Sequence, residues 1–177
     1  MSSAGCGRGS GRLGNPRVDV DHTVTHRWLS PNNVLIHVSL KISNRGEVLV
    51  PVLSTIVRIQ QIVPLDAGVA SQLAAGKDPV PKGQSEVPWP LLGKRCTEWD
   101  RGKHEIEPGE VEQTEYDFVL DATLQTVEVY TYIRNATKRG RNIGWGLTTL
   151  YDILAAATSS GGAKQVSVAR ASTRESA

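Results

Sequence analysis

The sequence predicts an all-β protein, an antiparallel β-sandwich of about seven strands with one long insertion loop. Three observations predict it. Apolar residues recur with a period of two through the middle of the chain, turn residues separate these stretches at short intervals, and no stretch has the 3.6-residue period of a useful amphipathic helix. A period of two is typical of strands with one buried face, and many short strands favour a sandwich over a parallel α/β sheet.

The first half of the chain predicts three strands. The first alternates from Val18 to Trp28, and the second, Val34 to Ile42, has the cleanest alternation in the chain and ends at the turn Asn44-Arg45-Gly46. The third runs from Val48 to Val63, where Pro51 either breaks the strand or places it at a sheet edge, because proline cannot donate a ladder hydrogen bond. The residues expected on one face of this strand are Leu53, Val57, Ile59 and Val63.

The second half of the chain repeats this style. Pro108-Gly109 suits a type II turn, because proline fixes φ and glycine accepts the positive φ of the next position. Apolar residues then alternate in three stretches, from Thr114 to Leu120, from Val127 to Ile133 and from Trp145 to Ile153. These stretches complete a set of six or seven strands.

Several of these features occur together in a known class of domain. They are the long strand that ends in Asn44-Arg45-Gly46, the turn Pro108-Gly109-Glu110, and the strand pair Phe118-x-Leu120 and Val127-x-Val129-Tyr130. This pattern, over roughly residues 18–153, resembles the immunoglobulin-like modules of bacterial surface and accessory proteins. The resemblance implies an immunoglobulin-like β-sandwich and is silent on the ligand.

The chain departs from antibody-type domains in its cysteines. Cys6 and Cys96 both lie outside the predicted strands, so we expect two free thiols and no disulfide between the sheets. The first 17 residues contain no apolar signal segment, and no stretch approaches the 18 or so apolar residues of a membrane span. We expect a soluble cytoplasmic protein without membrane contacts, unless a leader has been removed.

Composition divides the chain into a domain and two tails. Residues 1–16 and 157–177 are small and polar, so they lack the apolar surface that offsets the entropy of ordering, and we expect flexible tails. The β-sandwich domain is expected over residues 17–156. The C-terminal tail contains the mild alternation Val166 and Val168, which can add an edge strand in an assembly.

Residues 66–104 form an unusually long predicted connection. Loops of this length in compact domains are usually functional or disordered. One interpretation is a lid over the sandwich core. The other is a recognition loop that contacts a protein partner through Trp89 and Trp99, with Leu91 and Leu92 beside them.

The sequence offers little catalytic chemistry. It contains no nucleophile elbow, phosphate loop or two-histidine zinc motif, and Cys96 has no neighbouring cysteine. His22 and His26 lie four residues apart, about 13 Å along a strand, which is too far for one metal ion. The acidic run from Glu105 to Glu115 suits a solvated turn and strand face. We therefore expect no enzyme, no cofactor and no metal site.

Charge leaves two functions open. The net charge of +2 is too small to indicate a nucleic-acid-binding protein, but Lys138, Arg139 and Arg141 form a local basic run that Arg134 can extend. The leading hypothesis is a non-catalytic protein-interaction or self-assembly (structural) module that binds a protein partner or forms a homo-oligomer. The alternative is nucleic-acid or polyanion binding through this basic hairpin loop.

Overall fold

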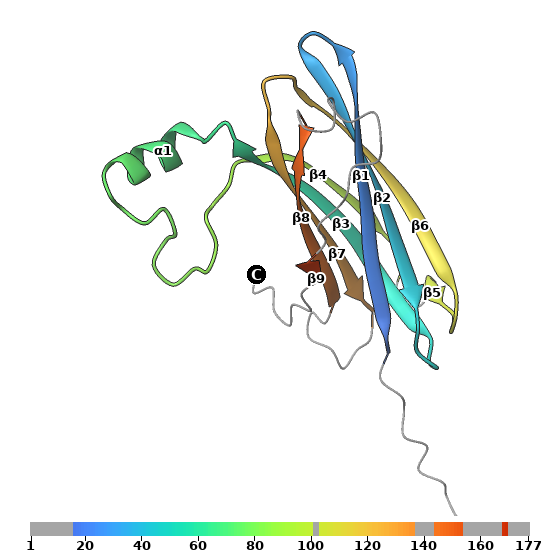
Figure 1. Cartoon of the computed structure of the whole chain (residues 1–177). Coiled ribbons are helices and arrows are strands. Elements are labelled where there is room, and N and C mark those ends of the chain that lie inside the picture. The colour runs from blue at the N-terminus through green and yellow to red at the C-terminus, as the bar shows by residue number, and fades with distance from the viewer. Residues whose placement is uncertain (1–15, 101–102, 137–143, 154–167, 170–177) are drawn as a thin grey trace, which may run out of the picture.

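A computed structural model describes residues 16–100, 103–136, 144–153 and 168–169. The fold is all-β with one short helix, and its strands form two antiparallel sheets that pack face to face (Figure 1). The prediction of an all-β antiparallel sandwich is confirmed.

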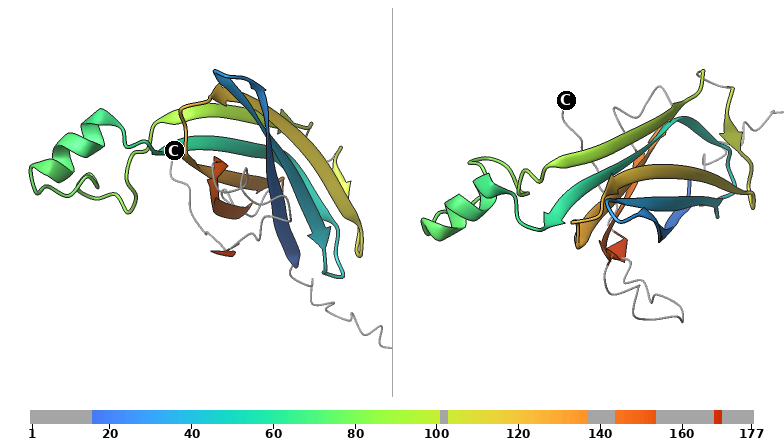
Figure 2. Two further views of the ribbon diagram at one scale, coloured as in Figure 1. Left: turned by 45° about the horizontal axis from the view of Figure 1, so that its top comes forward. Right: turned by 90° about the horizontal axis from the view of Figure 1, so that it is seen from above.

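The first sheet has three strands in the order β1-β2-β6, which are β1 (Val18–Ser30), β2 (Asn33–Asn44) and β6 (Val111–Asp121). The second sheet has the order β4-β3-β7-β8-β9, with β5 paired to β3. Its strands are β3 (Val50–Val63), β4 (Leu91–Glu98), β5 (Glu105–Ile106), β7 (Thr126–Asn135), β8 (Gly144–Asp152) and β9 (Val168–Ala169). Figure 2 shows the two layers from other directions.

The apolar core lies between the sheets on the faces that the alternation predicts. The inward side chains of β2 are at most 1% exposed, and they are Val34, Ile36, Val38, Leu40 and Ile42. They face equally buried residues of the second sheet, which include Val57, Ile59, Val127, Val129 and Ile133. The predicted inward face of β6 is also buried, with Tyr116, Phe118 and Leu120 at 8% exposure or less.

The third predicted strand differs from expectation in two respects. A register shift between Val52 and Ser54 changes which parity points inward, so the prediction that Leu53 shares the buried face of Val57 is wrong. Pro51 neither breaks β3 nor places it at an edge. It is the second residue of a central strand, a position that proline tolerates, and its carbonyl accepts from the N–H of Ala136 at 2.8 Å.

The prediction of a continuous loop over residues 66–104 is wrong in part. Helix α1 (Ala67–Ala74) begins at Asp66, whose side chain caps the N–H groups of Gly68 and Val69. The excursion that carries α1 projects from the sandwich (Figures 1 and 2), and the chain then returns as β4, which pairs with β3. β4 follows the core so closely that a Cβ at Gly93 would lie 2.7 Å from the Phe118 ring.

The ends of the chain are described only in part. Most of the predicted tails, residues 1–16 and 157–177, lie outside the described residues. Val168–Ala169 is the exception, because it pairs antiparallel with β8 of the same chain. The sequence predicts such an edge strand in an assembly, whereas this one forms within a single chain.

Asn44, the last residue of β2 in the first sheet, is hydrogen-bonded to backbone groups of β5 in the second sheet and of the turn before β3. Its side-chain amide donates to the carbonyls of Val48 and Ile106 at 2.8 and 2.9 Å, and its side-chain oxygen accepts from the N–H of Gly46. Its backbone carbonyl accepts from the N–H of Gly109, whose φ of +82° fits the predicted turn. A buried amide that satisfies this many backbone groups fixes the path of both turns.

A histidine crosses the interior from β1 to the second sheet. His22 is 1% exposed, and its Nδ1 and Nε2 lie 3.2 and 2.7 Å from the hydroxyls of Thr131 and Thr149. The Thr131 hydroxyl donates to the carbonyl of Leu147, so it accepts from an Nδ1–H group of His22. Nε2 then accepts from Thr149, and the neutral ring is held between β7 and β8.

A second polar contact joins the sheets on the opposite side of the core. The hydroxyl of Tyr116, on β6, is hydrogen-bonded to Thr55 of β3 and lies 3.2 Å from the hydroxyl of Thr97 on β4. The two edge strands of the first sheet, β1 and β6, are therefore each hydrogen-bonded to the sheet that faces them.

We expect Leu40→Ala to lower the free energy of unfolding by about 2 to 5 kcal/mol, because the change leaves a cavity at a position with no exposed surface. Lys41→Ala is the matched control, since Lys41 is exposed on the next residue of β2 and its loss should cost less than about 0.5 kcal/mol. Urea denaturation of both variants measures the difference. Equal effects would show that the inward parity of β2 is wrong.

Burial lowers the pKa of His22 from 6.5 to about 4, against a smaller opposing effect of Asp21. Below pH 6.5 His22 is protonated in the unfolded chain but stays neutral in the folded chain. The free energy of unfolding therefore falls as the pH drops towards 4. We expect this histidine to remove about 3 kcal/mol of unfolding free energy across that interval. His22→Gln, which cannot titrate, should flatten the profile there, and equally steep profiles in urea titrations would contradict the assignment.

Candidate interaction surface

The outer face of the three-stranded sheet presents an ordered array of polar side chains. Strand alternation places these residues opposite the core positions, and the pairing of β1, β2 and β6 aligns them in rows across the sheet. The three central rows are Thr25–His37–Asp117, Thr23–Ser39–Glu115 and Asp21–Lys41–Gln113. We call the exposed side of β1, β2 and β6, from Asp19 to Arg27 on β1, the outer face, and its end rows also expose Val111 and Val119.

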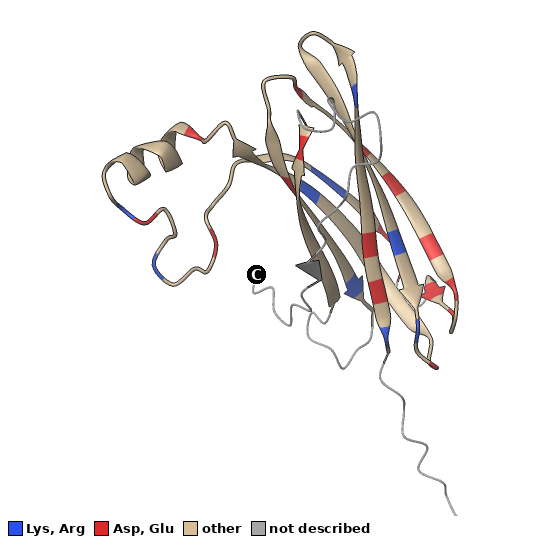
Figure 3. Ribbon diagram, in the orientation of Figure 1, with Lys and Arg blue, Asp and Glu red and all other residues tan. Residues whose placement is uncertain are grey.

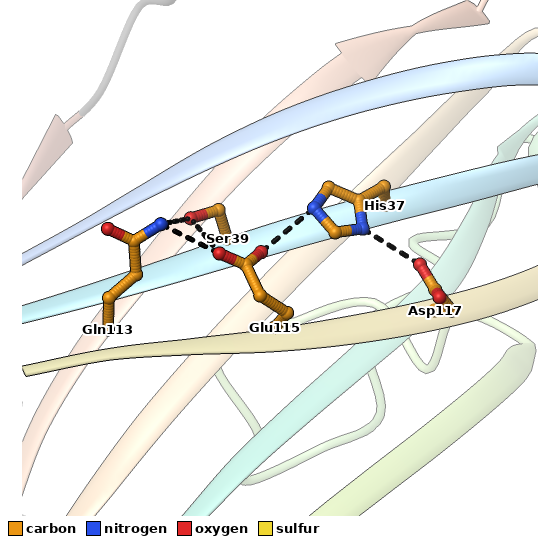
Figure 4. A network of polar contacts seen from close by, with 5 residues as sticks. All are labelled: His37, Ser39, Gln113, Glu115 and Asp117. Atoms are coloured by element: carbon orange, nitrogen blue, oxygen red, sulfur yellow. Dashed lines mark hydrogen bonds and ion pairs between the residues drawn. The ribbon is translucent and has the colours of Figure 1, made fainter.

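A hydrogen-bonded network occupies the centre of the outer face (Figure 4). His37 Nε2 lies 2.8 Å from Glu115 Oε2, and His37 Nδ1 lies 2.8 Å from Asp117 Oδ1. Glu115 Oε1 accepts from Ser39 at 3.1 Å and from Gln113 at 2.7 Å, and Gln113 also donates to Ser39. Because both imidazole nitrogens face carboxylates, the geometry favours the doubly protonated ring.

The network shifts the pKa values of its members in opposite directions. The hydrogen bond to Asp117 is the largest cause that raises the pKa of His37, and the charge of Glu115 adds to it. The hydrogen bond from Gln113 is the largest cause that lowers the pKa of Glu115. Burial opposes it, and the hydrogen bond from Ser39 lowers the pKa further. Near neutral pH these shifts favour an imidazolium between two carboxylates.

The network does not contain a serine paired with a histidine base. The Ser39 hydroxyl donates to the Glu115 carboxylate and not to His37, and the lowered pKa of Glu115 makes that carboxylate a weak base. The two carboxylates contact opposite nitrogens of the ring, and the described residues contain no group of three acidic, histidine or cysteine side chains that could hold a metal ion. The chemistry of the outer face is that of a preorganised polar surface.

Charge is divided unevenly along the chain. Residues 17–156 hold 17 of the 18 acidic residues and 15 of the 20 lysines and arginines, a formal net charge of −2, and the segments on either side carry +4. The outer face belongs to the acidic part, with acidic residues on β1 and β6 flanking Lys41 of β2 (Figure 3). Its exposed charged residues are Asp19, Asp21, Arg27, Lys41, Glu115, Asp117 and Asp121.

The four residues predicted to bind a partner do not form one patch. Trp89 precedes the eight-residue strand β4 and Trp99 follows it, so the two residues are roughly 30 Å apart along the extended backbone. Leu91 is 56% exposed beside the half-buried Trp89, whereas Leu92 packs against the core.

Trp99 has a structural role at its own end of β4. Its indole packs against the core and stacks on the His104 ring with centroids 4.2 Å apart, and His104 Nε2 lies 2.7 Å from Glu112. An aromatic ring that is half-buried and stacked offers little free area to a partner. The prediction that both tryptophans lie in one loop is wrong, because strand β4 lies between them.

Of the residues predicted to bind a polyanion, the structure places one. Arg134 is exposed near the end of β7 and is paired with Gly144 of β8. Lys138, Arg139 and Arg141 lie outside the described residues. Within the described residues, no helix is long and apolar enough to span a membrane.

No protein-family model and no curated protein matches the sequence. Among solved structures, β-glucosidase 3B from Thermotoga neapolitana in complex with α-D-glucose matches 88% of this chain at 12% identity, with a TM-score of 0.37. The ApaA protein from Bordetella pertussis matches 77% of this chain and 91% of its own length at 12% identity, with a TM-score of 0.39. The chain spans 17% of the length of the β-glucosidase. Likenesses of this size assign neither an activity nor a ligand.

We expect the pKa of His37 in the wild-type protein to lie above 6.5, because two carboxylates stabilise its charged form. Asp117→Asn should lower that pKa, since Asp117 supplies the largest stabilising contact. Thr25→Ala, in the same row of the sheet but outside the network, should leave it unchanged. An NMR titration of the His37 ring protons measures all three values, and a wild-type pKa at or below 6.5 would contradict the clamped geometry.

Proposed function

We propose that the chain is an immunoglobulin-like β-sandwich that acts as a non-catalytic protein-interaction or self-assembly module. The strand order supports the fold assignment. The first sheet, β1-β2-β6, corresponds to strands A, B and E of such a sandwich, and β4-β3-β7-β8 corresponds to C′, C, F and G. Sandwiches of this kind commonly present a sheet face, an edge or a group of loops to a partner.

The outer face carries this proposal. It is broad and exposed, with side chains of Glu115 and Asp117 at 45% and 64% exposure although hydrogen bonds hold them in place. Side chains that are fixed before association lose less entropy when a partner binds. Charged and polar groups at defined positions also favour specific association with a complementary surface.

The charge of the outer face favours one of the two functions that the sequence leaves open. Residues 17–156 carry a net charge of −2, and an outer face richer in carboxylates than in lysines and arginines would repel a polyanion and attract a basic partner. Nucleic-acid binding through Lys138, Arg139 and Arg141, with Arg134 beside them, would work against this repulsion. A protein partner therefore fits better, and the polyanion remains the second candidate.

Size-exclusion chromatography with light scattering tests the proposal. At about 50 mM NaCl we expect a mass above the 19.1 kDa monomer, which falls towards the monomer at about 500 mM NaCl as exposed charges are screened. Nuclease treatment is the control and should leave the mass unchanged. A monomer whose added mass absorbs at 260 nm and disappears with nuclease would favour the polyanion function instead.

A further inference from the structure

We infer that the outer face binds a second copy of this chain, by receiving the basic segment Lys138-Arg139-Gly140-Arg141 of that copy. The inference rests on the proposed function, because it names the partner of the same surface. It makes the contact heterologous, with one end of one molecule against the sheet face of another.

Charge complementarity supports this partner. Five carboxylates on the outer face stand against the side chains of Arg27 and Lys41, the protonated His37 between Glu115 and Asp117, and Arg45, which pairs with Asp19, so the face keeps an excess of one carboxylate. The centre of the face is also spatially defined. Glu115 and Asp117 are both hydrogen-bonded to His37, so their carboxylates are held at fixed positions before a partner binds.

The segment 138–141 suits the face better than the chain termini do. It concentrates three cations in four residues, whereas the C-terminal cations Lys164, Arg170 and Arg174 are spread over eleven residues. It is also joined on both sides to described strands, β7 and β8, which limits the positions that it can reach.

The segment 138–141 is too short to contact Glu115 and Asp117 on the outer face of its own molecule. Residues 137–143 join Ala136 to Gly144, so the tip extends at most about 14 Å from its anchors even when fully stretched. These anchors lie in the second sheet, at the end of the sandwich where β2 finishes. His37 is seven residues before Asn44, about 23 Å along β2. Its side chain lies on the outer face of the first sheet, which faces away from the second sheet. Contact with Glu115 and Asp117 therefore requires another molecule.

A charge-exchange experiment tests the inference. We would compare a face variant, Glu115→Lys with Asp117→Lys, a segment variant, Lys138→Glu with Arg139→Glu and Arg141→Glu, and their equimolar mixture by sedimentation at about 50 mM NaCl. Each variant alone should associate at least about tenfold more weakly than wild type. The mixture should recover association, because the reversed charges are again complementary.

Two controls keep the outcome clear. Glu86→Lys with Glu98→Lys makes the same change in net charge away from the outer face and should alter association less than about twofold. Should the lysine substitutions disturb the fold by circular dichroism, Glu115→Gln with Asp117→Asn replaces them and should weaken association in the same direction.

Each remaining result has a defined meaning. Association that persists in the face variant, or that the folded mixture fails to restore, overturns this inference and leaves the interaction module standing. A wild-type chain that stays monomeric at every salt concentration, and binds no other protein, overturns the proposed function as well.

Discussion

The buried hydrogen bonds of His22 are the constraint on which the arrangement of the sandwich depends. An imidazole with 1% exposure is tolerated only because two threonine hydroxyls on the facing sheet satisfy both of its nitrogens. These bonds fix the position of β1 over β7 and β8. Tyr116 does the same for β6 over β3 and β4, so polar contacts flank an apolar centre. Hydrogen bonds between side chains therefore join the two sheets on both sides of the core.

The character of the outer face follows from this interior. Because successive side chains on a strand point to opposite sides, fixing His22 and Leu40 inward fixes their neighbours outward in a single register. That register aligns His37 with Asp117 and sets Glu115 one row away. The polar network is thus a consequence of the pairing that builds the core. A slip of one residue would bury the acidic side chains and expose the apolar ones.

Much of the fold could be predicted from the sequence, because half-buried strands leave a period of two. β4 could not, since Gly93, Lys94 and Arg95 interrupt any alternation and the strand lies at an edge with little apolar area. The change of inward parity within β3 could not be predicted either, because no residue type identifies the position of a β-bulge. The network around His37 was also out of reach, because its partners lie about 80 residues away and meet only through the register of β2 with β6. The alternation His37-x-Ser39 was the one available signal, and it indicated only an exposed polar strand face.

The proposed contact joins the outer face of one molecule to the segment 138–141 of another, and zero-length cross-linking tests that contact most directly. A carbodiimide joins a carboxylate to a lysine amine only where the two touch. In an equal mixture of ¹⁴N-labelled and ¹⁵N-labelled protein, we predict cross-linked peptides of mixed isotope that join Lys138 to Glu115 or Asp117, and their loss at high salt. Cross-links from Lys138 that occur only within one isotope, or that reach carboxylates away from the outer face, would contradict the account.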